Sequence, residues 1–248
     1  MISRRRFVAT GASGLLLGGC DKLDRNPEFK GLLRSAEGLT MRSQRLIGDR
    51  NDLAREFSEA DLSPIFRSNG TSKPDTPDYA RHLSENFANW RIIVDGLVAR
   101  PLSIPIQMLR SLPHRTQITR HDCVEGWSAI GKWHGVQLSR LLDAAGLSTR
   151  AKYIVFHCAD RFGTWPYYES IDLIDAFHPQ TIIAWGMNDH LLPVANGAPL
   201  RLRVERQLGY KSAKYVQRIQ AVETLAGIYG GKGGYWEDNV DYEWYAGI

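Results

Sequence analysis

The residues with the most chemical potential surround a single cysteine in the middle of the chain. Cys123 stands among two acids, Asp122 and Glu125, with His121 before them and Trp127 after them. Three roles for its sulfur remain open: a small buried residue, a nucleophile with a histidine as base, or a soft thiolate ligand of a redox metal. A zinc site is poorly supported, because the sequence has no Cys-x-x-Cys pair and no histidine pair at helical spacing. A metal held here would need a cofactor that brings its own ligands.

A second group of residues has the chemistry of an anion site. The loop 209–214 combines glycine, serine and two lysines, and it follows Asn196 and Arg201 in the chain. Backbone N–H groups and positive charge in such a loop suit a phosphate, although a solvated basic turn explains the same residues. The loop is not a Walker motif and no GxGxxG is present, so nucleotide hydrolysis and dinucleotide binding are not indicated.

The elements that must position these residues are predicted to be mostly strands. Runs of β-branched and aromatic residues predict strands, and amphipathic spacing predicts short helices. The expected strands cover 90–98, 153–156, 181–185, 200–205 and 216–222, a hairpin turn is expected at 186–189, and short helices or turns are expected at 103–112, 138–145 and 171–177. This succession predicts a mixed, β-dominated α+β domain.

Four other segments carry separate expectations. Residues 32–57 have apolar residues near helical spacing, which predicts one or two surface helices packed on the main domain. The loop 66–79 is long enough to be either mobile or engaged with a ligand. Strict alternation in 200–205 places Leu200, Leu202 and Val204 inward and the charged residues on the other face. The aromatic residues of 230–248 must cover another part of the molecule.

The length and the net charge of the chain limit the classes of function that it can have. At 248 residues with 43% hydrophobic content, the chain has enough material for one domain plus an appendage. The three arginines at 4–6 lower the formal net charge from +4 to +1 when removed, so a general nucleic-acid surface is not implied. The predicted organisation is a signal over 1–19, a tether and N-terminal helices over 20–62, and the main domain over 63–248.

The N-terminus has the pattern of an export signal. Residues 3–8 carry a twin-arginine motif, the following apolar run is too short to span a bilayer, and Leu17–Cys20 resembles a lipobox. We therefore expect export by the twin-arginine route to the periplasm, with a membrane anchor on lipidated Cys20; the alternative is a basic, apolar N-terminus with an incidental cysteine. Because the periplasm is oxidising, a disulfide between Cys123 and Cys158 is an alternative to two free thiols.

Four motifs in order resemble one family. The segments 120–128, 133–138, 196–201 and 209–214 are similar to the molybdopterin-binding domain of the sulfite oxidase family. The resemblance is greatest to its bacterial exported branch, which includes the catalytic subunit of periplasmic methionine-sulfoxide reductase. It implies a sulfite-oxidase-type fold of mixed β-sheets with short peripheral helices.

The resemblance also implies roles for individual residues. It makes Cys123 the protein ligand of molybdenum in a molybdenum-molybdopterin cofactor. The cofactor contacts that it implies are Asn69, Cys158, Asn196, Arg201, Lys211, Ser212, Ala213 and Lys214. Cys158 departs from the family, which usually has Thr or Ser there. Candidates for the substrate side are Glu125, Arg161 and Tyr168, with His121 behind them.

The implied activity is oxygen-atom transfer on a small sulfur-containing or oxyanion substrate. Electrons would be exchanged with a haem-containing partner, and we expect a monomer. No cationic sulfite clamp is identified in the sequence, which leaves sulfite in doubt as the substrate. Two alternatives stay open: a catalytically silent lipoprotein that uses the same fold as a binding module, and a thiol-based redox protein that uses Cys123 and Cys158.

Overall fold

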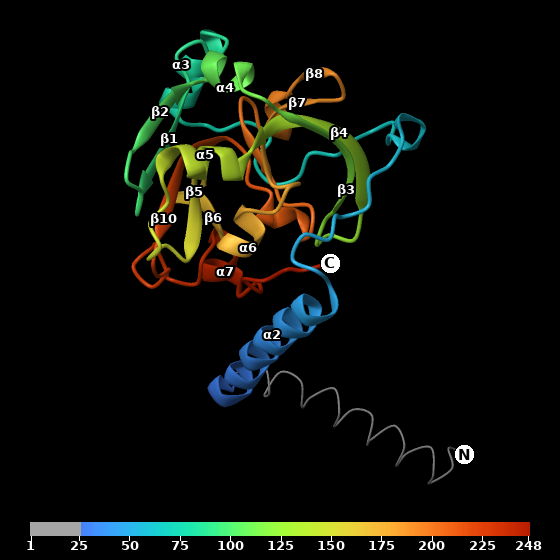
Figure 1. Ribbon diagram of the computed structural model, residues 1–248, viewed down its shortest axis with the longest axis vertical. Coiled ribbons are helices and arrows are strands. Elements are labelled where there is room, and N and C mark those ends of the chain that lie inside the picture. Colours follow the sequence, from blue (N-terminus) through green and yellow to red (C-terminus); the bar gives the residue numbers. More distant parts are fainter. Residues whose placement is uncertain (1–25) are drawn as a thin grey trace, which may run out of the picture. The chain divides into compact units, whose positions relative to one another are not determined.

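The computed structural model describes residues 26–248 (Figure 1). The predicted twin-arginine motif and the lipobox cysteine Cys20 lie outside the described residues. The chain divides into two compact units, one that ends at Gly48 and one that comprises Asp49–Ile248. This division falls before residue 62, the predicted end of the N-terminal segment. Because the two units are not placed relative to one another, each is described by itself.

The first unit contributes one described helix, α2 (Pro27–Ile47). The side chain of Asn26 caps its start, accepting the backbone N–H of Glu28 at 2.8 Å. The helix ends at Ile47, ten residues before residue 57, the end of the predicted helical segment. Residues 48–57 form no further helix, and one of them bonds to strand β3 (Arg115–Asp122): the Phe57 N–H donates to the carbonyl of Ile118 at 2.9 Å. No helix of residues 26–248 is long and apolar enough to cross a bilayer.

The second unit contains two five-stranded sheets, seen on the two sides of the body in Figure 1. The first sheet has the order β2 (Leu102–Pro105), β1 (Arg91–Gly96), β10 (Val216–Val222), β5 (Tyr153–Phe162) and β6 (Trp165–Asp172). The second has the order β3 (Arg115–Asp122), β4 (Ser128–Gln137), β7 (Ile182–Met187) and β8 (His190–Leu191), with β9 (Arg201–Arg203) also paired to β7. All pairs are antiparallel except β1 with β10.

Short helices surround the sheets, which confirms the predicted α+β class. They are α3 (Pro77–Ser84), α4 (Ile106–Ser111), α5 (Leu138–Ala145), α6 (Leu173–Ala176) and α7 (Tyr235–Val240), with 3-10 turns at Glu59–Asp61, Val194–Asn196 and Gly209–Lys211. Helix α5 follows its sequence pattern closely: its apolar residues are buried, and Gly146 ends it in the left-handed conformation at φ 71°. Each leucine that it buries contributes about 1.5–3 kcal/mol to folding.

The cysteine loop is the connection of a β-hairpin rather than the approach to a helix. Strands β3 and β4 pair along their whole length from Arg115 and Gly135 to Asp122 and Ser128. The connection closes on itself, because the Cys123 N–H donates to the carbonyl of Trp127 at 2.9 Å. A complete strand therefore separates Cys123 from α5, and the rigid hairpin determines where the sulfur lies.

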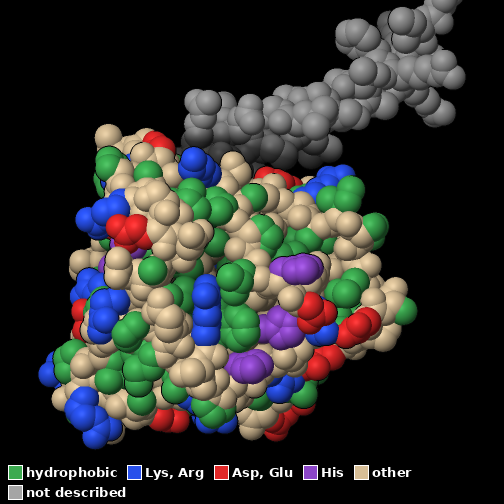
Figure 2. All heavy atoms as spheres, turned by 90° about the horizontal axis from the view of Figure 1, so that it is seen from above, with side chains coloured by type: hydrophobic (Ala, Val, Ile, Leu, Met, Phe, Trp, Pro, Cys, Tyr) green, Lys and Arg blue, Asp and Glu red, His purple; other side chains and the backbone are tan. Residues whose placement is uncertain are grey.

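One face of the molecule carries mixed charge (Figure 2). Basic and acidic side chains are interspersed there, and histidine side chains gather in one area. His114, directly before β3, and His134 of β4 both contact the Trp185 ring, with centroid distances of 5.5 and 6.0 Å. Lys132 pairs with Asp189 at 2.9 Å in the same sheet. Such interspersed charges form local pairs rather than one extended basic surface.

Candidate cofactor and active site

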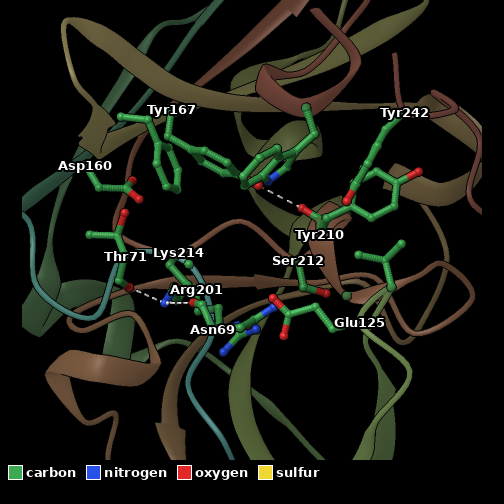
Figure 3. Close-up of a pocket in the computed structure, with 15 residues that line it drawn as sticks. Asn69, Thr71, Glu125, Asp160, Tyr167, Arg201, Tyr210, Ser212, Lys214 and Tyr242 are labelled. Carbon is green, nitrogen blue, oxygen red and sulfur yellow. Dashed lines mark hydrogen bonds between the residues drawn. The ribbon is translucent and has the colours of Figure 1, made fainter. Parts of the chain in front are cut away.

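A pocket of about 700 Å³ lies where several distant segments meet (Figure 3). Its polar end is formed by the side chains of Asn69, Thr71, Asp160, Arg201 and Lys214. Its aromatic end is formed by Phe162, Tyr167, Tyr210, Trp236 and Tyr242. Val124 and Glu125, the two residues that follow Cys123, line it as well. The pocket thus joins the predicted cysteine site and the predicted anion site.

Cys123 is buried next to this pocket and is hydrogen-bonded. Only 5% of the residue is exposed, and its Sγ atom accepts a hydrogen bond from Nδ2 of Asn69 at 3.1 Å. Burial raises the pKa of the thiol, as does the Glu125 carboxylate, while hydrogen bonds from the Glu125 backbone and Asn69 oppose the rise. Hydrogen-bond donors on a sulfur stabilise its thiolate form, which is the form that binds a metal.

The surroundings of Cys123 do not suit a nucleophile. In the described part of the chain, its hydrogen-bond donors are an amide and a backbone N–H, and none is a histidine. His121, the nearest candidate base in sequence, is buried, and its Nδ1 atom lies 2.8 Å from Nη1 of Arg203. Burial and the Arg203 charge lower the pKa of His121 well below its usual range, so the ring is neutral. His121 does not line the pocket, and its ring lies against Gly209, which does.

Arg201 places a buried positive charge at the polar end of the pocket. Its Nη1 atom donates to the carbonyl of Asn196 at 3.1 Å, whereas its Nε atom has no partner in the described structure. Burial and the neighbouring Arg203 lower the pKa of Arg201 to about 9. The Nδ2 atom of Asn196 also lacks a partner. Buried donors without partners are costly, so both groups are suited to an anionic or hydrogen-bonding ligand.

Lys214 supplies the second cation and fixes the loop that carries Asn69. Its Nζ atom donates to the backbone carbonyls of Asn69 at 2.7 Å and Ala195 at 3.1 Å, and also to that of Thr71. Burial and the Arg201 charge lower the pKa of Lys214 to about 7. The turn beside it requires glycine, because Gly197 has φ 113° and a Cβ there would lie 2.9 Å from Cγ of Lys214.

The remaining members of the predicted anion loop divide between two environments. Ser212 lines the pocket and Ala213 is buried. Lys211 points elsewhere: its completely buried Nζ atom lies 2.7 Å from Glu169 and 2.5 Å from Glu237. Lys211 therefore attaches the loop to β6 and α7, and it does not line the pocket.

The predicted substrate-side residues are not brought together. Glu125 lines the main pocket, and its carboxylate accepts a hydrogen bond from Nε1 of Trp127 at 3.0 Å. Arg161 lines a second hollow together with Cys158. Tyr168 lines a third hollow, and its hydroxyl donates to the carboxylate of Asp238. Of these candidates, only Glu125 lies in the same pocket as the Cys123 loop.

The two cysteines of the described residues are both free thiols. Cys158 is buried on β5, and burial raises its pKa well above the usual range. The hollow that it lines shares Asp160 with the main pocket. A position at the far end of the cofactor site therefore fits Cys158 better than a role as redox partner of Cys123.

Asp160 is the residue of the pocket that sequence reasoning missed. It is buried, it lines the pocket, and its Oδ1 atom has no hydrogen-bond partner in the described structure. Burial raises its pKa to about 6, against the opposing effects of a Thr71 hydrogen bond and the Lys214 charge. Its signal in the sequence is its place in the polar run 157–161 that follows the predicted strand 153–156.

The pocket fits a molybdopterin cofactor in charge and in hydrogen bonding. A pterin has N–H groups that suit the free acceptor of Asp160, and its phosphate suits the free donors of Arg201 and Asn196. A buried thiol whose sulfur accepts two hydrogen bonds has the chemistry of a soft metal ligand.

Comparison with known proteins identifies the family. Residues 80–227 match the model of the oxidoreductase molybdopterin binding domain. The chain belongs to this family. It is 38% identical over 196 residues to the putative protein-methionine-sulfoxide reductase subunit YedZ1 of Azospira oryzae, covering 77% of this chain and 70% of the relative. The protein is thus a molybdopterin-binding oxidoreductase of the sulfite oxidase family, as the sequence motifs predicted.

Further relatives carry the name protein-methionine-sulfoxide reductase catalytic subunit MsrP. The identity is 36% over 171 residues with the protein of Xanthomonas campestris, covering 64% of this chain and 52% of the relative. It is 33% over 178 residues with that of Ralstonia nicotianae, covering 67% and 53%. The molybdopterin oxidoreductase therefore spans about half the length of these MsrP relatives.

A solved structure supports the fold. The sulfane dehydrogenase SoxCD of Paracoccus pantotrophus superimposes with a TM-score of 0.50 at 22% sequence identity, over 55% of this chain and 39% of that chain. At this identity the likeness concerns the fold alone, and it agrees with the sulfite-oxidase-type fold that the sequence predicted.

Proposed function

We propose that this oxidoreductase reduces sulfoxides, with methionine sulfoxide in proteins as its substrate, at a molybdenum atom bound by Cys123. The observation that carries the proposal is the hydrogen-bonded Cys123 thiol beside a pocket that holds the unpartnered polar atoms of Arg201 and Asp160. The names of the YedZ1 and MsrP relatives support the substrate class.

The cofactor proposed is molybdenum-molybdopterin. Arg201, Asn196 and Ser212 would hold its phosphate, and Asp160 would accept hydrogen bonds from the pterin. Asn69 and the Glu125 backbone would orient the Cys123 sulfur. When bound, the cofactor supplies a two-electron centre that can accept an oxygen atom from the substrate.

The reaction consumes electrons and protons in fixed proportion. A sulfoxide, two electrons and two protons give a thioether and water, so the sulfur is reduced and the oxygen leaves as water. Arg201 and Lys214 would be occupied by the cofactor, whereas near Cys123 the Glu125 carboxylate would repel an anion such as sulfite and favour a neutral substrate. The aromatic end of the pocket suits the methyl and sulfur groups of methionine.

The same proposal includes the setting of the enzyme. We propose a haem-containing electron donor, export by the twin-arginine route to the periplasm, a lipid anchor on Cys20, and a monomer. The motifs of residues 3–8 and 17–20 support export and anchoring, and the word subunit in the relatives' names supports a separate partner.

The test uses protein matured in a host that makes the cofactor. Molybdenum and pterin content are measured first, and then the reduction of methionine sulfoxide in an oxidised protein with a reduced viologen as electron donor. We expect near-stoichiometric metal and turnover in the wild type, and loss of turnover with an intact fold in Cys123→Ser. Cys158→Ser is the matched control, because it also removes a buried thiol but restores the residue type usual in the family.

Three outcomes would contradict the proposal in different ways. A metal-loaded enzyme that oxidises sulfite and leaves sulfoxides unchanged would overturn the substrate. A correctly matured but metal-free protein would favour the silent binding module. Mass spectrometry that found a Cys123–Cys158 disulfide in the native protein would favour the thiol-based alternative.

A further inference from the structure

Helix α2 is well defined at both ends although it lies outside the catalytic unit. Asn26 caps its first turn through the N–H groups of Glu28 at 2.8 Å and Phe29 at 3.4 Å, and Pro27 occupies the first helical position. The Gly48 N–H closes the last turn on the carbonyl of Gln44 at 2.9 Å. With 21 residues, the helix is about 31 Å long.

One side of this helix is apolar and faces solvent. Ala36, Leu39, Leu46 and Ile47 fall within an arc of about 100° when successive residues are turned by the angle of an α-helix. All four are exposed, Leu39 to 62% and Leu46 and Ile47 to 88% each. The exposed Ser43 shares this arc, and an exposed apolar side of a helix indicates a contact site.

The opposite side of the helix is basic. The helix has four basic residues, at positions 30, 34, 42 and 45, and two acidic residues, Glu28 and Glu37. By the same helical geometry, positions 30, 34 and 45 fall on the side opposite to the apolar arc, and Arg42 lies beside the arc. A net positive polar side attracts anionic surfaces.

We propose that α2 lies in the membrane surface, with its apolar side among the acyl chains and its basic side toward anionic headgroups. No helix of residues 26–248 is long and apolar enough to span a bilayer, whereas an amphipathic helix with a basic polar side is typical of one that lies in the interface. The inference concerns a second membrane contact and is independent of the chemistry proposed for Cys123.

The position of the helix in the chain suits this partner. Asn26, the cap of α2, is the sixth residue after Cys20, the cysteine of the predicted lipobox. Six residues span at most about 21 Å when fully extended. A lipid on Cys20 would therefore hold the start of α2 close to the bilayer, where the helix can make a further contact with the membrane surface.

The test measures membrane binding by the helix in a protein that lacks the lipid anchor. The full chain carrying Cys20→Ala, loaded with cofactor, is sedimented with vesicles of phosphatidylcholine alone and with vesicles that also contain phosphatidylglycerol. We expect binding to the anionic vesicles at least about tenfold tighter than to the neutral ones, with a decrease at high salt. The triple variant Leu39→Glu, Leu46→Glu, Ile47→Glu should lose this binding by about tenfold or more.

The matched control is Leu191→Glu, which places the same charge at another exposed leucine, 59% exposed on β8. It should bind vesicles like the parent protein. Reduction of a soluble sulfoxide should be unchanged in the triple variant, so failure of the membrane proposal and failure of the proposed function are distinguishable. Hydrogen exchange should show α2 amides protected when anionic vesicles are added.

Two results would overturn the proposal. One is equal binding of the parent and triple-variant proteins to anionic vesicles. The other is a lower melting temperature or a changed oligomeric state of the triple variant in the absence of vesicles, because either would show that the apolar side packs on this chain's own catalytic unit or on a second copy.

Discussion

The Nδ2 atom of Asn69 donates a hydrogen bond to the Sγ atom of Cys123 at 3.1 Å, although 54 positions separate the two residues in the chain. The long loop that carries Asn69 is held in place by Lys214 and by the hydroxyl of Tyr215, which donates to the carbonyl of Thr71 at 2.9 Å. A loop that reads from sequence as mobile or ligand-bound is thus fixed as one wall of the cofactor pocket. Three substitutions, two of them with a control variant, test how this pocket and its supporting loop are built.

Arg201→Met should have opposite effects on stability and on cofactor content. In the protein without cofactor, Arg201 is a buried cation with an unpartnered Nε atom, so its replacement should raise the free energy of unfolding by about 1–3 kcal/mol. The same change should lower the pterin content of matured protein, because it removes a phosphate contact. Urea unfolding of the cofactor-free protein and pterin extraction from the matured protein measure the two effects.

Arg203→Met is the control for this prediction. Arg203 is equally buried, but it pairs with Glu205 at 2.6 Å. Its replacement should therefore destabilise the cofactor-free protein by about 3–5 kcal/mol, because it leaves a buried carboxylate without its partner. Loss of stability in both variants would show that Arg201 is a structural residue.

Asp160→Asn should change how stability depends on pH. The folded pKa of about 6 lies above the ordinary value of 3.8, so the folded state holds a proton that the unfolded state releases. Wild-type stability without cofactor should therefore fall as the pH rises from about 4 to about 6, by up to about 3 kcal/mol, and then stay level. The asparagine variant should lack this fall. Urea unfolding at a series of pH values measures it, and parallel curves for the two proteins would refute it.

Lys211→Met should destabilise the fold strongly although Lys211 does not line the pocket. It leaves Glu169 and Glu237 buried together without their cation, which should cost about 3–5 kcal/mol. Lys232→Met is the control, since its pair with Asp241 is about 40% exposed and should contribute less than about 1 kcal/mol. Thermal unfolding of both variants gives the comparison. Similar losses of stability in the two would show that burial does not determine how much an ion pair contributes to stability here.

Local patterns in the sequence predicted much of the fold. Helix α5 with its terminal Gly146, strand β10 and the β7–β8 hairpin all follow from spacing and turn residues. The hairpin turn uses Asn188 and Asp189, both at positive φ, a conformation that these residue types tolerate. In these elements the residues that determine the structure lie within a few positions of each other.

Contacts between distant segments were not predictable in this way. Arg203 was expected on a face with no special environment, yet it is buried with its guanidinium 4.3 Å from the centre of the Trp133 ring. Strand β4, which carries Trp133, reads as a polar and aromatic mixture, and only its pairing with β3 and β7 makes it a strand. For the same reason the free carboxylate of Asp160 is recognisable only once its neighbours are known.

The motifs predicted the site better than they predicted the role of each residue. One pocket is lined by Asn69, Arg201, Ser212 and Lys214, and Cys123 lies beside it, hydrogen-bonded to Asn69. Asn196 does not line this pocket. Lys211, Arg161 and Tyr168 lie elsewhere, because neighbours in sequence alternate between the faces of strands and turns. The order of the motifs in the chain predicted which loops form the site. Which side chains of those loops reach the pocket depends on how they pack in the folded structure.

The most direct test of the central claim is X-ray absorption at the molybdenum edge of matured wild-type protein and of Cys123→Ser. We expect the number of sulfur atoms bound to the metal to fall by one in the variant, because the protein thiolate is lost while the sulfurs of the cofactor remain. An unchanged sulfur count in a metal-loaded Cys123→Ser protein would contradict the assignment of Cys123 as the molybdenum ligand.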